Sequence, residues 1–159
     1  MKVLVTGGAG YLGIHIIIKL LKKKNINVFI LDDFSNSNIQ ILKYIKKSFK
    51  NKLKIKKINL KFKKKIENVF IKNDFDHIIH LAAKIDAKES SIKKKMYMIN
   101  NYEVTKNLLD LANKYNVKKF IFASSAAIYG NVKKEYCFEN QRKYPINPYG
   151  LSKLKSENY

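Results

Sequence analysis

The sequence is short of several residue types, and each shortage excludes a class of protein. One cysteine cannot form a disulfide within the chain, and three scattered histidines with one thiol offer no zinc-site spacing. Two prolines and six glycines in 159 residues exclude collagen-like and proline-rich chains. A hydrophobic content of 46% excludes a wholly disordered chain. This length and composition predict a single compact domain that is stabilised by packing.

Long apolar runs are also missing. Lys19 and the triplet Lys22–Lys24 interrupt the first apolar helix, so no stretch reaches the roughly 18 residues of a membrane span. The chain begins directly with an apolar strand, which leaves no room for the apolar region of a signal peptide. We therefore expect a cytoplasmic protein with no membrane partner.

Arginine and acidic residues are scarce, whereas lysine is abundant. The 33 basic residues against 12 acidic ones give a net charge of +21, which would suit a nucleic-acid partner if the charges formed an organised patch. However, 32 of the 33 are lysine and Arg142 is the one arginine, the residue type preferred for bidentate phosphate and guanine contacts. Lys, Ile and Asn, all with A/T-rich codons, make 70 of the 159 residues. Genome composition explains the charge more simply, and nucleic-acid binding is the less favoured alternative.

Apolar runs and helical patterns alternate five times along the chain. Strands are expected at residues 2–6, 28–31, 53–58, 77–81 and 119–123. Helices are expected at residues 11–21, 39–47, 62–71 and 95–115, and again from residue 148. This alternation predicts an α/β protein with a doubly wound parallel sheet, a Rossmann fold, because right-handed crossovers place helices on both faces. The strands are apolar with little alternation, as expected when both faces are covered.

A glycine-rich turn follows the first strand. Gly7, Gly10 and Gly13 are spaced as in a dinucleotide-binding turn, where glycines allow a tight turn, close approach of a pyrophosphate and close helix packing. Asp32 lies 19 residues beyond Gly13 at the end of the second strand, where a carboxylate can accept from ribose hydroxyls and repel a 2′-phosphate. A glycine turn alone could be structural, but with this acid it predicts binding of NAD rather than NADP.

The polar residues that follow Asp32 allow two interpretations. Asp33, Ser35, Asn36 and Ser37 could hydrogen-bond the adenosine ribose. A capped start of the next helix explains them equally well.

A serine, a tyrosine and a lysine form the candidate catalytic set. Ser125 follows the fifth strand, and Tyr149 comes 24 residues later with Lys153 one helical turn beyond it. A phenol, with an ordinary pKa of about 10, becomes a usable base when a cation lies beside it. Tyr149 is thus the candidate general base, and Ser125 can hydrogen-bond the same substrate oxygen. Because lysine is so common here, chance would often produce such a pair; its place after Asn147–Pro148, a helix-start signal, argues against chance.

These motifs, in this order, resemble the extended short-chain dehydrogenase/reductases, and among them most closely the UDP-glucose 4-epimerases. The resemblance is carried by Thr6–Gly13, Leu31–Ser37, His80–Ala83, Lys88–Ser90, Ser124–Gly130 and Asn147–Leu154. It implies a bound NAD that takes a hydride from C4 of a UDP-sugar while Tyr149 removes the 4-hydroxyl proton. The hydride returns to the other face of the keto-sugar, which interconverts glucose and galactose.

The resemblance also completes the expected cofactor site. The full set is Gly7, Gly10, Tyr11, Leu12, Gly13, Asp32, Asp33, Ser35, Asn36, Ser37, Asn59, Leu60, Leu81, Ala82, Ala83, Asn100, Tyr149 and Lys153.

The sequence departs from the family in several places. Related sugar dehydratases carry acids where Ala126 and Ala127 stand, so dehydration is disfavoured. The family often has Asp at Asn59 and usually Gly at Val104. Its cofactor-loop lysine falls on Ile85, so that contact is unassigned.

Length is the largest departure, because proteins of this family are considerably longer. We expect residues 1–159 to be one NAD-binding Rossmann domain, truncated before the last strands and without the C-terminal domain that holds the UDP-sugar. A homodimer or a separate C-terminal half are the expected partners besides the UDP-sugar, and the chain alone should turn over weakly or not at all. A related reductase or decarboxylase and a non-catalytic NAD-binding remnant are the alternatives.

Overall fold

The computed structural model of the chain describes residues 1–132 and 136–159. The chain divides into two compact units, one of residues 1–82 and 108–123, the other of residues 83–107 and 124–159.

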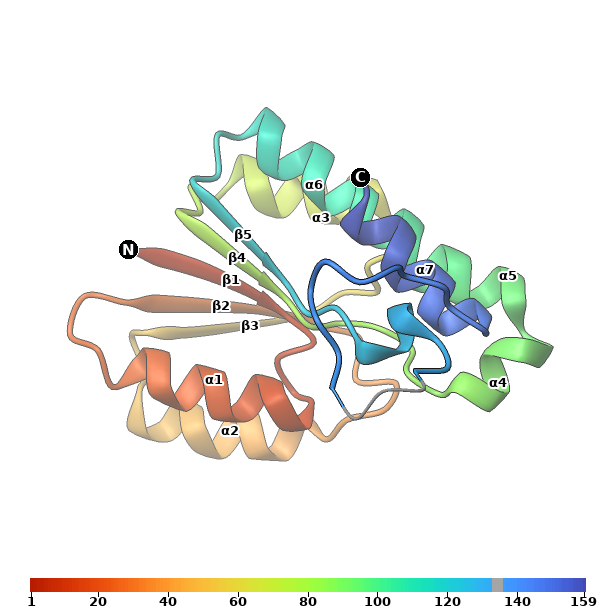
Figure 1. Cartoon of the computed structure of the whole chain (residues 1–159). Helices are drawn as coiled ribbons and strands as arrows, with labels where there is room; N and C mark the ends of the chain where they lie inside the picture. The colour runs from red at the N-terminus through yellow and green to blue at the C-terminus, as the bar shows by residue number, and fades with distance from the viewer. Residues whose placement is uncertain (133–135) are drawn as a thin grey trace. The chain divides into compact units, whose positions relative to one another are not determined.

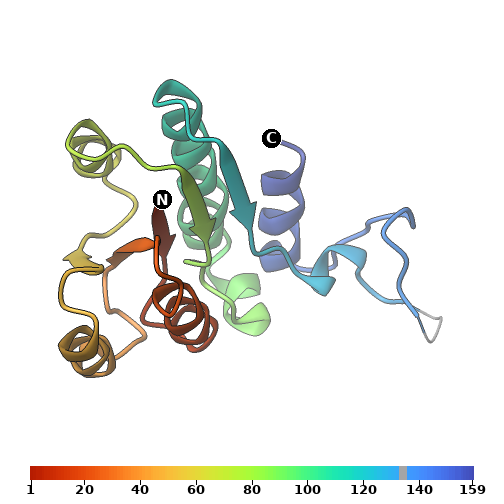
Figure 2. The same ribbon diagram turned by 90° about the vertical axis from the view of Figure 1, so that its left-hand side faces the viewer.

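The first unit is built on a five-stranded parallel sheet. Its strands are β1 (Lys2–Thr6), β2 (Asn27–Asp32), β3 (Leu53–Lys57), β4 (His77–His80) and β5 (Lys119–Phe122). The spatial order is β3-β2-β1-β4-β5, as Figure 2 shows from left to right. The chain moves outward from β1 to β3 and then crosses back to β4 on the other side of β1. This order confirms the predicted doubly wound sheet and puts the topological switch point between β1 and β4, where such folds bind ligands.

Helices cover both faces of this sheet (Figure 1). The helices α1 (Tyr11–Leu21) and α2 (Ile39–Ser48) lie on one face. The other face carries α3 (Lys63–Ile71) and the part of α6 (Val104–Lys114) that belongs to this unit. The predicted bounds of α1 match the structure, because its apolar residues keep helical spacing up to the lysines that end it.

Side chains of alternating strand positions fill the two layers between sheet and helices. On the α1 and α2 side, Val3 and Val5 of β1 belong to one buried cluster with Ile30 of β2, Ile17 of α1 and Leu42 of α2. The edge strands are less buried: β3 and β5 expose some of their side chains, as expected for strands with one sheet neighbour.

Aromatic rings dominate the opposite layer. Phe75 makes edge contacts with Phe29 and Phe70, at centroid distances of 5.6 and 5.4 Å. Phe70 also contacts Tyr115 at 5.6 Å. Rings in such edge arrangements add to the burial of their own apolar area.

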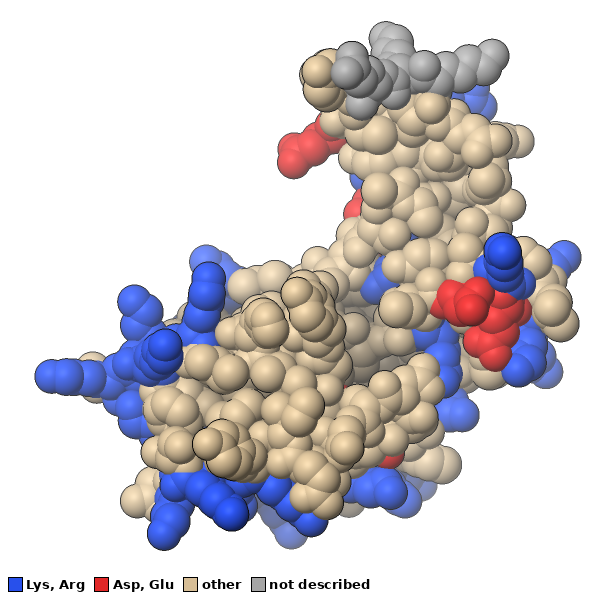
Figure 3. Space-filling view, turned by 90° about the horizontal axis from the view of Figure 1, so that it is seen from below, with Lys and Arg blue, Asp and Glu red and all other residues tan. Residues whose placement is uncertain are grey.

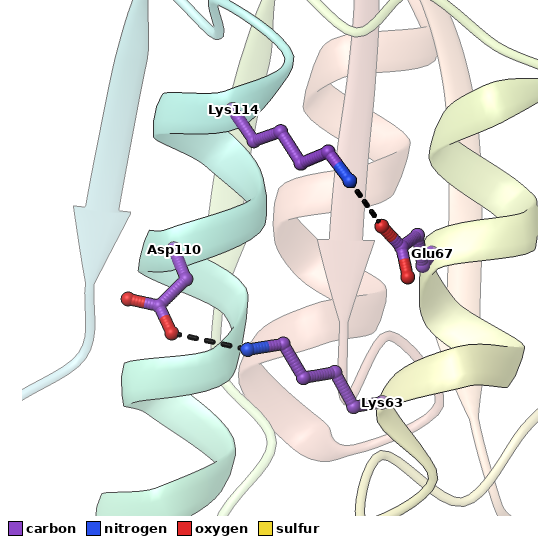
Figure 4. A network of polar contacts seen from close by, with 4 residues as sticks. All are labelled: Lys63, Glu67, Asp110 and Lys114. Carbon is purple, nitrogen blue, oxygen red and sulfur yellow. Dashed lines mark hydrogen bonds and ion pairs between the residues drawn. The ribbon is translucent and has the colours of Figure 1, made fainter.

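Two ion pairs join α3 to α6 above this layer (Figure 4). The Nζ of Lys63 lies 3.2 Å from the carboxylate of Asp110, and the Nζ of Lys114 lies 2.6 Å from that of Glu67. Hydrogen bonding and charge from Lys114 lower the pKa of Glu67. All four side chains are partly exposed, so each pair contributes at most about 1 kcal/mol to the stability of the fold.

The second unit is helical. It contains α4 (Ala87–Ile92), α5 (Lys94–Tyr97), a π-helix η1 (Met98–Glu103), a 3₁₀ turn η2 (Ala126–Tyr129) and α7 (Pro148–Glu157).

The helix predicted at residues 95–115 is not a continuous α-helix in the structure. Residues 95–115 were expected as a single α-helix, but the segment runs through the wider turns of the π-helix before α6 begins. Asn100 and Asn101, both weak helix formers, lie in these turns, and π turns of this kind often occur at functional sites. Neither α4 nor η2 was predicted, because segments this short leave no periodicity to detect.

We expect Phe70→Ala to lower the free energy of unfolding by about 3–5 kcal/mol, because it removes a ring that is 2% exposed. The matched control is Phe62→Ala, whose ring is 53% exposed and should cost under about 1 kcal/mol. Chemical denaturation of both variants measures this difference. Equal losses would contradict the difference in burial between the two rings.

Candidate active site

The carboxyl end of β1 turns sharply into α1 at Gly7. Its φ is +68°, in the left-handed region that favours glycine. A Cβ on Gly7 would lie 2.6 Å from the backbone nitrogen of Ala82, so the loops after β1 and β4 approach with no room for a side chain. A Cβ on Gly13 would lie 2.5 Å from the carbonyl oxygen of Gly7. The structural roles predicted for these two glycines, the tight turn and close helix packing, are confirmed.

The start of α1 is open to an anion. Gly10 is the N-cap and has no side chain to cap the helix, and the first turn contains no acidic residue. The first N–H groups of any helix have no acceptor within it, and the helix dipole gives them a positive potential. Tyr11 and Leu12, in this first turn, are both exposed.

The Asp32 carboxylate ties the end of β2 to this turn. One oxygen accepts from the N–H of Ala9 at 2.9 Å, and the other accepts from the N–H of Phe34 at 2.8 Å and the hydroxyl of Ser37 at 3.2 Å. Asp32 is only 8% exposed. Besides the predicted role toward a ribose, the side chain therefore fixes the loop beside the glycine turn.

Asp33 and Asn59 face each other at the carboxyl ends of β2 and β3. The Asn59 amide donates to the Asp33 carboxylate at 3.1 Å and accepts from the N–H of Lys61 at 3.0 Å. The other Asp33 oxygen accepts from the N–H of Ser35 at 2.9 Å. The residues lining a cavity of ≈ 490 Å³ here are Asp33, Ser35, Lys57, Ile58, Asn59, Phe62 and Lys65.

The two interpretations of the polar loop are resolved in part. The helix cap is Asn38, whose side chain accepts from the N–H of Gln40 at 2.8 Å. Ser37 instead donates to Asp32, and Asn36 is exposed. Capping of α2 is therefore the role of Asn38 and does not account for the four polar residues before it, whose contact with a ribose stays a prediction.

At the end of β4, His80 has a structural role. Its Nδ1 forms a 2.6 Å hydrogen bond with the Thr6 hydroxyl, and the ring is buried. The N–H of Leu81 donates to the carbonyl oxygen of Thr6 at 3.1 Å. This bond fixes the start of the Leu81–Ala82 segment next to Gly7.

In the second unit, Ser125 begins the 3₁₀ turn. Its Oγ accepts from the N–H of Ala127 at 3.1 Å, as the N-cap of η2. A hydroxyl that accepts one bond still has its proton to donate. Ser125 can therefore donate to an oxygen placed beside it.

Tyr149 and Lys153 lie one turn apart on α7. Lys153 is 3% exposed. Burial lowers the pKa of Lys153 from 10.5 to about 8. Tyr149 is half-buried, and the pair shares a helix face as its spacing predicted.

Gly150 sets how closely α7 approaches the turn that follows Ser125. A Cβ on Gly150 would lie 2.5 Å from the carbonyl oxygen of Ala127. Any side chain would push the helix away. The glycine next to Tyr149 thus places α7 against the turn that Ser125 begins.

A residue that the sequence analysis missed, Asn101, connects this arrangement to the segment after β4. Its side-chain amide donates to the carbonyl of Lys84 at 2.9 Å and to the hydroxyl of Ser152 at 3.0 Å, and it accepts from the N–H of Lys84 at 2.8 Å. It is 2% exposed. Asn100, the neighbour that was expected at the cofactor, donates to the carbonyl of Met96 at 2.7 Å. Two consecutive asparagines inside a helical run were the only sequence signal.

The predicted residues fall into two groups. The first unit holds Gly7, Gly10, Tyr11, Leu12, Gly13, Asp32, Asp33, Ser35, Asn36, Ser37, Asn59, Leu60, Leu81 and Ala82, and the second holds Ala83, Asn100, Ser125, Tyr149 and Lys153.

Basic side chains do not cover the α1 and α2 face evenly. Figure 3 shows them projecting around its edge, with an uncharged centre. Within residues 1–132 and 136–159, no group of three or more metal-ligating side chains comes together. In the same residues no helix is long and apolar enough to cross a membrane.

The chain belongs to a family of the extended short-chain dehydrogenase/reductases. The family model described as GDP-mannose 4,6 dehydratase matches residues 4–159.

The chain is similar to several sugar-nucleotide epimerases. The chain is 38% identical over 162 residues to UDP-glucose 4-epimerase 3 of Oryza sativa subsp. japonica, covering 99% of this chain and 43% of the relative. The UDP-Glc/GlcNAc 4-epimerase of Campylobacter jejuni has a TM-score of 0.94 at 34% identity, covering 99% of this chain and 47% of that one. The UDP-glucose 4-epimerase of Bifidobacterium longum, solved with NAD+ and UDP, has a TM-score of 0.91 at 36% identity, with coverages of 99% and 47%. The chain therefore spans about half the length of these relatives.

The burial of Lys153 predicts a pH-dependent stability. Between pH 8 and 10.5 the unfolded chain keeps this proton and the folded chain releases it, so the Lys153 contribution to the free energy of unfolding rises with pH in that window. Lys153→Met should be more stable than the wild type near neutral pH, and this advantage should shrink by up to about 1.4 kcal/mol per pH unit as the pH passes through the window. Urea denaturation at several pH values measures the difference.

Lys155→Met is the control for that experiment, because Lys155 is exposed on the same helix. Its difference from the wild type should stay constant with pH. A constant difference for Lys153→Met as well would show that the ammonium is not buried.

Proposed function

We propose that this chain is the NAD-binding half of a UDP-sugar 4-epimerase that interconverts UDP-glucose and UDP-galactose. The observation that carries the proposal is the similarity to UDP-glucose 4-epimerases over 99% of the chain at 38% identity. A buried Lys153 one turn from Tyr149 supports it, because this burial suits a reacting site rather than a solvated surface.

The residues present fit NAD. The space beside Gly10 is open, because a Cβ there would meet only the carbonyl oxygen of Gly7, at 3.4 Å, and the uncapped start of α1 suits a pyrophosphate. The carboxylate of Asp32 lies beside this turn, where it would accept from ribose hydroxyls and repel a 2′-phosphate. When bound, NAD supplies the hydride acceptor and donor for C4 of the sugar.

The second unit supplies the proton chemistry. Tyr149 takes the proton of the 4-hydroxyl as general base and returns it to the oxygen in the reverse direction. The Lys153 ammonium favours the phenolate form of this base. Ser125 donates a hydrogen bond to the same substrate oxygen, because the bond that it accepts from the N–H of Ala127 leaves its proton free to donate.

Dehydration is the reaction named in the family model, but the residues beside Ser125 do not support it. Elimination requires acid and base groups beyond the tyrosine, and Ala126 and Ala127 form the turn η2 without any. Epimerisation needs only the proton transfer at one oxygen. A homodimer, a C-terminal half that holds the UDP-sugar, and a cytoplasmic location stay predictions.

The cofactor choice can be tested by titration calorimetry with NAD and NADP. We expect NAD to bind at least about tenfold more tightly than NADP, because the 2′-phosphate would lie against the Asp32 charge. Asp32→Asn should narrow this ratio. Asp74→Asn removes the same charge from an exposed loop at the opposite edge of the sheet and should leave the ratio unchanged. If neither dinucleotide binds, the proposed function is wrong.

Turnover can be tested with Tyr149→Phe. We expect epimerisation of UDP-glucose to fall by about 10²-fold or more while NAD affinity stays within about threefold, because the change removes only the phenol oxygen. The assay uses both this chain and the longest product of its gene, with other UDP-, GDP- and dTDP-sugars in parallel. Preference for a reductase or decarboxylase substrate would support a related sugar-nucleotide enzyme instead. NAD binding without any turnover, even in the longest product, would support a non-catalytic NAD-binding remnant.

A further inference from the structure

Each N–H group in the first turn of α7 has a hydrogen-bond acceptor. Pro148, the first helical residue, has no N–H group. The N–H of Gly150 donates to the side chain of the N-cap, Asn147, at 2.8 Å. Between them, the N–H of Tyr149 donates to the hydroxyl of Ser90 at 3.1 Å. The backbone of the candidate base is therefore held by a side chain from a segment 59 residues away.

The hydroxyl of Ser90 donates one hydrogen bond and accepts another, each with a fixed partner. It is 0% exposed, and its proton is given to the carbonyl oxygen of Ala87 at 2.6 Å. Because a hydroxyl has a single proton, its lone pairs are left to face the Tyr149 N–H. Ser90 thus acts here only as an acceptor.

The helix that carries Ser90 is itself anchored. Its N-cap, Asp86, accepts from the N–H of Glu89 at 2.8 Å. The Glu89 carboxylate accepts from the Tyr97 hydroxyl at 2.9 Å and pairs with Lys93 at 2.8 Å. Burial, with the Glu89 carboxylate beside it, raises the pKa of Tyr97 to about 12, so the phenol keeps the proton that makes this bond. Ser90 is therefore a fixed point rather than a mobile side chain.

We propose that Ser90 is a positioning residue for Tyr149: it fixes the backbone of the base at the start of α7 and thereby the place of the phenol. The proposal rests on the proposed function of Tyr149 as general base. A small displacement of a reacting group lowers the reaction rate strongly. A single hydrogen bond that fixes the backbone of the base can therefore change the rate. It also gives the Lys88–Ser90 motif a role that the cofactor site does not supply.

The contact can be measured by amide hydrogen exchange in protein labelled with ¹⁵N-tyrosine. The chain has ten tyrosines, and the Tyr149 resonance is identified by its loss in Tyr149→Phe. In Ser90→Ala we expect exchange at Tyr149 to be about tenfold faster, with the amides of the other tyrosines nearly unchanged. Ser90→Thr keeps the hydroxyl and should retain the protection.

The chain supplies a matched control in Ser91, whose exposed hydroxyl also points to the Ala87 carbonyl, at 3.5 Å. Ser91→Ala should leave exchange at Tyr149 unchanged. Exchange at Tyr149 that is the same in Ser90→Ala as in wild type, or equally fast in Ser91→Ala, would overturn the proposal.

Turnover gives the functional readout. In the epimerase assay, Ser90→Ala should lower kcat by about tenfold with KM within about twofold, because the change moves the base and not the binding groups. A kcat equal to that of Ser91→Ala would also overturn the proposal. The exchange measurement needs neither NAD nor turnover, so a failure of the proposed function, shown by full activity of Tyr149→Phe or by no NAD binding, is distinct from a failure of the Ser90 contact.

Discussion

The close approach of backbone to backbone at the end of β1 is the constraint from which the first unit's site is built. The loop after β1 passes the segment after β4 so closely that a Cβ on Gly7 would meet the backbone of Ala82 at 2.6 Å. The same turn leaves 2.5 Å between a Cβ on Gly13 and the Gly7 carbonyl. Because these contacts are between backbones, no rotamer change can relieve them. The position of α1, and so of its open N-terminus, follows from them.

The helices α1 and α7 differ in what accepts hydrogen bonds from their first N–H groups. Both begin with N–H groups that lack an acceptor within the helix. The start of α1 has glycine as its N-cap and no capping side chain, which leaves a positive site for an anion. The start of α7 is closed by Asn147 and Ser90, which leaves nothing for an anion and holds the backbone of Tyr149 instead. The start of α1 is suited to binding a phosphate, and the start of α7 to holding the backbone of the candidate base in place.

The features of the fold that could be predicted from the sequence are those that depend on residues close together along the chain. The bounds of α1, the glycine turn and the order of elements all follow from periodicity and turn chemistry, and the strand order confirms the doubly wound sheet. The roles of Asn101 and Ser90 could not be predicted, because their hydrogen bonds join residues 51 and 59 positions apart. The π turns could not be predicted either, because over six residues the pattern of apolar side chains does not distinguish a π-helix from an α-helix.

Because lysine is so abundant, the spacing of Tyr149 and Lys153 alone does not distinguish a functional pair from a chance one, but the burial of Lys153 does. In a chain with 32 lysines, a tyrosine four residues before a lysine is expected by chance. Chance lysines, however, remain on the surface, since burying an ammonium costs free energy. Among the residues that the structure describes, Lys153 is the only buried lysine. Lowering its pKa from 10.5 to about 8 corresponds to about 3 kcal/mol at neutral pH, a large fraction of the stability of a small protein. Amino-acid composition does not explain this cost in free energy, whereas the proposed role of Lys153, a cation beside the candidate base Tyr149, does.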